Sequence, residues 1–254
     1  MPAGIGIGQI LGLVREMRGL EGTPPMIVIS GPGAEGMASA LAVGGDRSAI
    51  AVDGYTAAAA VALRIVEGDP GERERALLRR LAKEQTPVIV VRRGGSGRIP
   101  HVLADDVVDL GSDDLGADDI GAVASAIVGV AGASGPPLAA RLPVLYAPVC
   151  QRLVARTAFA NAALAGSSRV VPQLPLLTLA QARMLLLLRV ARGETLPRDA
   201  EGLLRAAGPY LLAALGTGVG ARAFVRRLPV RGPIVRAAIA YGGTRALGSA
   251  VLRR

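Results

Sequence analysis

The chain has 254 residues and a formal charge of +9, because 29 Lys and Arg residues stand against 20 Asp and Glu residues. It is 51% hydrophobic and only 2% aromatic. A charged fraction of 19% and a positive mean hydropathy exclude a disordered chain. The single cysteine, Cys150, and the single histidine, His101, exclude a disulfide framework, a cysteine-based zinc site and a multi-histidine metal centre.

The charge is divided unequally along the chain. Residues 1–150 carry 13 basic and 17 acidic residues, whereas residues 151–254 carry 16 arginines and three acidic residues. Such a change of sign predicts two domains with different partners, one of them anionic. We expect an N-terminal amphipathic helix (1–22), an α/β domain (23–131), a linker (132–140) and a basic, hydrophobic helical domain (141–254).

The N-terminal segment has one apolar helical face. Ile7, Ile10, Leu11, Val14 and Met17 recur at helical spacing and predict a helix that packs on the first domain. A helix lying on a membrane surface is the alternative. The segment lacks the basic start and the cleavage site of a signal peptide, so we expect none.

The α/β domain is predicted from apolar runs that alternate with helical patterns. The run at 26–30 is apolar on both faces, which is typical of a parallel sheet covered on both sides. The fold class is therefore α/β, P-loop-like or Rossmann-like with a mostly parallel sheet, followed by an all-α domain. Further strands are expected at 48–52, 61–66, 88–91 and 106–110, and helices at 72–84 and 118–130.

One connection is short for a parallel crossover. About seven residues separate Asp53 from Val61, and a crossover usually needs roughly ten or more. Either residues 55–60 form a very short helix or one of the two flanking segments is not a parallel strand.

The first strand runs directly into a glycine-rich turn. Gly31, Gly33 and Gly36 precede a helix, the setting in which backbone N–H groups can hold a phosphate. Gly31 and Gly36 have the spacing of G-x-x-x-x-G-K-S/T, but Met37 and Ala38 replace the lysine and the hydroxyl that phosphoryl transfer requires. The three glycines are the candidate cofactor-binding residues, with a plain tight turn as the alternative, and no catalytic residue is expected.

The candidates for metal binding are weak. Asp53 follows a strand and is the one candidate magnesium ligand, with an N-cap or turn carboxylate as the favoured alternative. His101 is expected in a surface loop. The acidic tract from Asp105 to Asp119 lacks the spacing of an EF-hand, which favours a solvated face and a helix start over a cation site.

The order of these elements resembles a shortened domain of the Era-like GTPases. In that family the strand corresponding to 88–91 leads into Asn-Lys-x-Asp, which selects guanine, but here it leads into Arg92-Arg93-Gly94-Gly95-Ser96-Gly97. Asp53 matches the start of the family's D-x-x-G, although Thr56 replaces the glycine. The resemblance implies a GTPase scaffold without the groups that bind and hydrolyse the nucleotide.

The second half is predicted to be helical. Proline residues separate apolar, arginine-containing segments, and Thr178 resembles the start of a capping box. No segment is a convincing bilayer span, because the uncharged stretches are short or are interrupted by glycine and proline. Helices are expected at about 146–166, 176–192, 200–216, 217–228 and 232–252.

Four stretches of the second half carry a further resemblance, 152–161, 175–184, 216–232 and 240–248. Through them, residues 141–254 are similar to the YcjF-like helical domain. The resemblance implies membrane association and assigns no catalytic residues.

Together these patterns predict a non-catalytic scaffold or adaptor. The first domain is nucleotide-incompetent and has no cofactor, and the helical domain docks on an anionic membrane surface or a protein partner, or forms a homo-oligomer. Nucleic acid is disfavoured because no aromatic platform accompanies the arginines. We expect a cytoplasmic protein, peripheral or integral at the cytoplasmic face of the inner membrane. The alternative is a divergent GTP- or ATP-binding protein with residual NTPase activity, using the 31–36 backbone and Asp53.

Overall fold

A computed structural model covers the whole chain, and two compact units can be distinguished in it. Residues 23–149 and 191–193 form a sheet-containing unit, and residues 1–22, 150–190 and 194–254 form a helical unit. The structure describes residues 24–54, 59–111, 115–167, 174–197 and 232–252, together with residues 12, 13, 15–17, 19, 20, 201, 202, 205 and 208.

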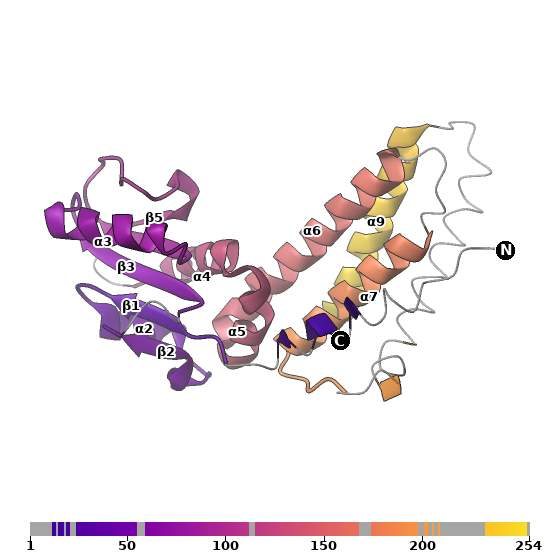
Figure 1. Cartoon of the computed structure of the whole chain (residues 1–254), viewed down its shortest axis with the longest axis horizontal. Coiled ribbons are helices and arrows are strands. Elements are labelled where there is room, and N and C mark those ends of the chain that lie inside the picture. The colour runs from indigo at the N-terminus through magenta and orange to yellow at the C-terminus, as the bar shows by residue number, and fades with distance from the viewer. Residues whose placement is uncertain are drawn as a thin grey trace. The chain divides into compact units, whose positions relative to one another are not determined.

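The sheet has five strands, all parallel (Figure 1). Its spatial order is β2-β1-β3-β4-β5. Most strand residues are buried because helices cover both faces, so the predicted parallel sheet is confirmed. The strands are β1 (Ile27–Ser30), β2 (Ile50–Val52), β3 (Val61–Glu67), β4 (Val88–Arg93) and β5 (Val107–Leu110).

Three helices cover the sheet at the positions predicted. The helices are α2 (Ala34–Leu41), α3 (Glu72–Lys83) and α4 (Ala117–Ala131). The chain leaves β1 toward β2 on one side and leaves β3 toward β4 on the other, and right-handed crossovers then place α2 and α3 on opposite faces. α4 contacts α2, which assigns it to the same face. On the other face Leu78 of α3 packs against Val66 and Val90.

The short connection between β2 and β3 does not interrupt the parallel pattern. Ile27 of β1 lies opposite both Ile50 and Val61 in parallel register, so both flanking segments are parallel strands. The prediction that one of them is not a parallel strand is wrong. Of the very short helix expected at 55–60, residues 59 and 60 are not helical. Residues 55–58 lie outside the described residues, and a helical turn there stays a prediction.

The segment 132–140, predicted as a linker, is helical. It forms η3 (Gly132–Ser134) and α5 (Gly135–Arg141), and η4 (Pro143–Leu145) follows. Glycine and proline residues favour a loop in sequence-based prediction. Proline is also compatible with the first turn of a helix, where its missing N–H costs no hydrogen bond, and the prolines of α5 lie there. Leu138, Leu142 and Leu145 are fully buried, so the segment belongs to the core of the sheet-containing unit.

One described helical stretch, Ala117–Arg141, is long and apolar enough to cross a membrane by length and composition. Half of its most apolar window is buried within the protein. Its first part, α4, packs against β3, β4 and β5. The apolar composition is therefore also that of a core helix.

The N-terminal segment packs on a different unit from the one predicted. Its described residues between 12 and 20 are helical, and Met17 is 4% exposed against Leu186 and Leu187. Glu16 accepts hydrogen bonds from the Nε and Nη2 of Arg183. Both an apolar and a charged contact thus join this segment to the helical unit, and the expected packing on the first domain is wrong.

The helical unit contains α7 (Leu174–Ala191), α9 (Pro233–Leu252) and most of α6 (Tyr146–Ser167). These helices agree with the predicted ranges to within two residues. Thr178, expected to start a helix, instead lies inside α7 and is 3% exposed. The helices expected at 200–216 and 217–228 fall almost wholly outside the described residues.

A polar cluster joins the three helices. The Oγ1 of Thr244 on α9 accepts hydrogen bonds from Asn161 of α6 at 3.0 Å and from Gln181 of α7 at 3.2 Å, and it donates to the carbonyl of Ala240 at 2.8 Å. Asn161 and Thr244 are fully buried. Because these bonds need one alignment of the helices, they favour a single packing register.

Candidate functional site

The turn after β1 lies at the carboxyl edge of the sheet. Gly31 has a φ of +110°, and a Cβ there would lie 2.2 Å from the carbonyl oxygen of Ile65 on β3. Gly33 has a φ of +73° and is the N-cap of α2. Gly36 lies inside α2 with open space around it, so only the first two predicted glycines are required by the turn.

The positions that would carry a lysine and a hydroxyl in a phosphate-transferring loop lie in the core. Met37 and Ala38 are both fully buried, and their side chains therefore face away from the solvent side of the turn. Glu35 is exposed, and its carboxylate is 2.9 Å from Arg47 Nη2. The turn has neither the ammonium group nor the magnesium-binding oxygen of an NTPase.

Asp53 follows β2 and is exposed. It has a φ of +52°, and its backbone N–H donates to the carbonyl of Ile29 at 2.9 Å. His101 is also exposed in a turn, with a φ of +66°. Among the described residues no three His, Cys, Asp or Glu side chains come together as metal ligands.

No sequence motif indicates the role of the arginine pair that ends β4. Arg92 is 7% exposed and donates from Nε and Nη2 to the two oxygens of Asp109, at 2.6 and 3.0 Å, and from Nη1 to the carbonyl of Gly97 at 2.5 Å. Hydrogen bonding to Arg92 lowers the pKa of Asp109 below its usual range. Arg92 therefore has a structural role, because it joins β4 to β5 and to the loop at Gly97. The alignment of β4 with β5, which makes Arg92 and Asp109 register partners, is not readable from spacing.

The loops after β3 and β4 are joined at the same edge. The N–H of Gly97 donates to Asp69 Oδ1 at 3.0 Å, and Gly68 donates to the carbonyl of Arg93 at 2.8 Å. The guanidinium group of Arg93 extends to Gly33, where a Cβ would lie 3.1 Å from its Nη1. The edge therefore brings together the glycine turn and one arginine that no motif indicated.

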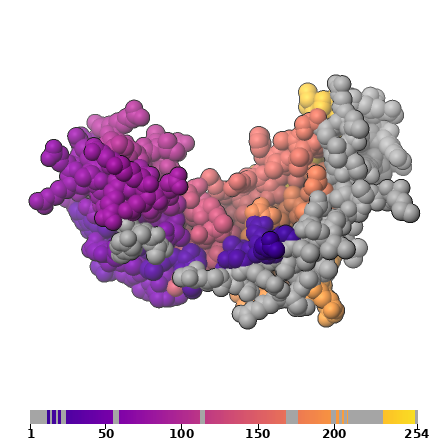
Figure 2. Space-filling model, viewed as in Figure 1, coloured from indigo at the N-terminus to yellow at the C-terminus, as the bar shows by residue number. Residues whose placement is uncertain are grey.

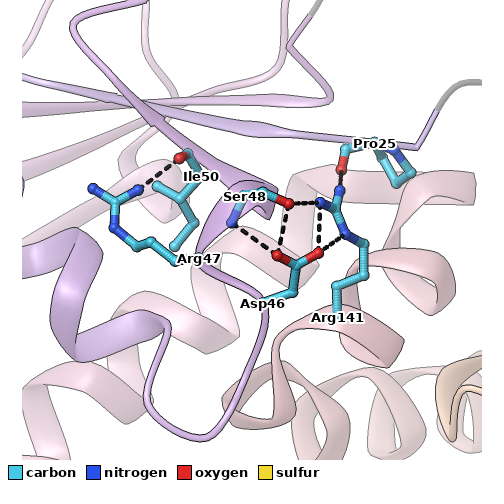
Figure 3. Close-up of polar contacts among 6 residues, drawn as sticks. All are labelled: Pro25, Asp46, Arg47, Ser48, Ile50 and Arg141. Atoms are coloured by element: carbon cyan, nitrogen blue, oxygen red, sulfur yellow. Dashed lines mark hydrogen bonds and ion pairs between the residues drawn. The ribbon is translucent and has the colours of Figure 1, made fainter.

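A second polar network lies at the opposite, amino edge of the sheet (Figure 3). Arg141, at the end of α5, donates to Asp46 at 2.9 Å, to Ser48 Oγ at 2.8 Å and to the carbonyl of Pro25 at 3.0 Å. Pro25 and Ser48 precede β1 and β2, so the network ties the starts of both strands to α5. The Ser48 hydroxyl, Arg141 and the Ser48 N–H lower the pKa of Asp46 to about 2. All the partners belong to the protein itself, which favours a structural role.

This network predicts an acid-dependent loss of stability. The pKa of Asp46 lies below its ordinary value of 3.8, so its contribution is complete above about pH 4 and is lost as the pH falls through about 2. Asp46→Asn should lower the urea midpoint near neutral pH, and its difference from the wild type should disappear below about pH 2. Asp105→Asn, an exposed carboxylate without an ion pair in the described part of the chain, is the control. Equal effects of Asp46→Asn at both pH values would contradict the prediction.

Comparison with known proteins provides no relative. No family model, curated protein or solved structure matches this chain. The resemblances to Era-like GTPases and to the YcjF-like domain thus remain hypotheses that rest on the residues given above.

Proposed function

We propose that this protein is a non-catalytic docking protein whose helical unit binds an anionic membrane surface. The observation that carries the proposal is on α6, where Phe159 is 72% exposed and Arg156, one turn before it, is exposed as well. Arg156 has no ion-pair partner in the described ranges. An aromatic side chain that enters the headgroup region beside a free cation is the usual chemistry of a helix lying on anionic lipid.

A second helix of the same unit repeats this pattern. On α9, Tyr241 is 39% exposed and the guanidinium of Arg245 lies 5.8 Å from the centre of its ring, while Ile234 is 81% exposed. Part of α6 forms the surface of the unit in the view of Figure 2 (salmon). The excess of arginine over acidic residues in residues 151–254 adds long-range attraction to a negative surface.

Residual NTPase activity has less support. Met37 and Ala38 are buried where the lysine and the hydroxyl would have to face the ligand. Phosphoryl transfer depends on both groups to neutralise and position the phosphates. The sheet-containing unit fits a binding role better than a catalytic one.

Vesicle flotation tests the proposal. The full chain should float with vesicles of phosphatidylcholine and phosphatidylglycerol at low salt, and binding should weaken at high salt because the charges are screened. Arg156→Gln should reduce the partition coefficient about five-fold, and Phe159→Ser about ten-fold or more, from the lost charge and the lost apolar burial.

The matched control is Val43→Ser. Val43 is 72% exposed, as is Phe159, but it belongs to the sheet-containing unit, so its replacement should leave flotation unchanged. A chain that floats with no vesicle at any salt concentration would refute membrane docking and leave a protein partner for the helical unit. Equal reduction by Val43→Ser would show that the effect is not specific to α6.

A further inference from the structure

Arg93, the last residue of β4, is a partly buried arginine whose side chain has no partner within the described ranges. Among the described residues, three buried side-chain atoms lack a hydrogen-bond partner, the Nε atoms of Arg64 and Arg93 and the Oδ1 of Asn161. Arg64 still pairs with Glu74, and Asn161 still donates to Thr244. Arg93 has no hydrogen bond and no ion pair at any side-chain atom within the described ranges. The Nε–H is buried without an acceptor, which is unfavourable. The two Nη groups beside Gly33 also have no partner within the described ranges, and they are the groups that an external anion would meet.

The guanidinium group points to the start of α2. A Cβ at Gly33 would lie 3.1 Å from Nη1 and 3.3 Å from Nη2 of Arg93, so the cation rests on the backbone of the N-cap. No side chain caps α2, and helix geometry leaves the first N–H groups, those of Gly33, Glu35 and Gly36, without intrahelical acceptors. These donors and the positive end of the helix face the same region as Arg93.

The topology places this region where open parallel sheets bind ligands. In the sheet, β2 lies on one side of β1 and β3 lies on the other. The turn after β1 therefore lies at the point where the strand order reverses. The contact between Gly31 and Ile65 holds the turn closely against β3. Arg93 comes from β4, the next strand, and lies at the same carboxyl edge.

We infer that Arg93 and the α2 N-terminus bind a single phosphate-class anion, such as a phosphate monoester. A guanidinium group presents paired N–H donors that match two phosphate oxygens, and the helix N–H groups can donate to a third. The cation comes from a strand end and not from the helix position of Met37, so the site differs from a nucleotide-triphosphate loop. This inference is independent of membrane docking.

The few positive charges at this site limit the charge of the anion that it can bind. Glu67 on β3 is the register partner of Arg93, is exposed and makes no ion pair with it. One guanidinium beside this carboxylate suits one phosphate group. A magnesium triphosphate would require cations that the described residues do not provide here.

The test is a titration of the ¹⁵N-labelled full chain with inorganic phosphate, followed by amide chemical shifts. The amides of Gly33, Glu35 and Gly36 should shift and saturate. Arg93→Gln should raise the Kd about ten-fold or more, since it removes charged hydrogen bonds. Arg98→Gln, which removes an exposed arginine from the loop after β4, should leave the Kd unchanged.

A second variant distinguishes a specific effect on phosphate binding from a loss of folded protein. Glu67→Gln removes a negative charge near the site and should lower the Kd about two- to five-fold, a gain that unfolding cannot produce. Titration with glycerol phosphate tests a lipid headgroup as the source of the anion, and phenyl phosphate tests a soluble monoester. Either one binding at the same amides supports the inference.

Three results would overturn the inference. The first is that the three amides do not respond to phosphate. The second is that Arg93→Gln and Arg98→Gln have equal effects. The third is that magnesium ATP binds at these amides more than ten-fold tighter than phosphate, which would assign the site to a nucleotide.

Discussion

Gly31→Ala is expected to destabilise the sheet-containing unit by about 3–5 kcal/mol, because backbone strain and a steric clash act together. The φ of +110° is one that side chains with a Cβ rarely adopt, and the new Cβ would lie 2.2 Å from the Ile65 carbonyl oxygen. That oxygen belongs to the backbone of β3 and cannot move without disturbing the pairing with β1. Urea unfolding measures the loss, and hydrogen exchange of the β1 and β3 amides assigns it to this unit.

Gly36→Ala is the matched control for this change. Gly36 lies in the same glycine pattern but inside α2, with nothing within 4 Å of a new Cβ. Alanine should therefore stabilise the helix by up to about 1 kcal/mol. If Gly31→Ala left the exchange protection of β1 and β3 unchanged, the close approach to Ile65 would be wrong.

Gly248→Ala is expected to destabilise the helical unit by about 2 kcal/mol through overpacking. Gly248 on α9 is buried, and a Cβ there would lie 2.5 and 2.7 Å from the two γ-methyl groups of Val154 on α6. The helices can approach this closely only because the glycine has no side chain. Urea unfolding, with hydrogen exchange of the α6 and α9 amides, measures the effect.

A double-mutant cycle makes this prediction specific. Val154→Ala removes both methyl groups, so it should restore much of the stability lost in Gly248→Ala, with a coupling energy of about 1 kcal/mol or more. Gly242→Ala, on the same helix with open space around it, should not destabilise. Additive effects of Gly248→Ala and Val154→Ala would mean that α6 and α9 do not meet at this point.

The strands and helices of the first unit were predictable because each carries a strong local signal. The runs around Ile29 and Val90 are short and apolar on both faces, a pattern typical of a covered parallel sheet. The start of α3 carries acidic residues, Glu72 and Glu74, where a helix dipole favours them. The segment around Pro136 was predicted wrongly because proline is compatible both with a loop and with the first turn of a helix.

The candidate site was predictable only in part. Its glycines follow a buried strand, and the absence of a lysine and a hydroxyl at Met37 and Ala38 was readable from the spacing alone. The position of Arg93 beside these glycines was not predictable, because Arg93 is 60 positions after Gly33 in the chain. A double arginine directly after a buried parallel strand was the available signal, since all carboxyl ends of parallel strands meet at one edge.

The division of charge, the elements and the missing catalytic groups follow from the order of the residues, because each depends on neighbours a few positions away. Which charges find partners is decided by contacts between distant segments. Arg92 meets Asp109, Arg141 meets Asp46 and Glu16 meets Arg183 only after folding, and Arg93 meets no acceptor among the described residues. Strand order and helix packing set the distances between these charged groups. Because the interaction between two charges weakens with distance, only groups that folding brings close together form ion pairs. The spacing of the residues in the sequence does not reveal which groups these are.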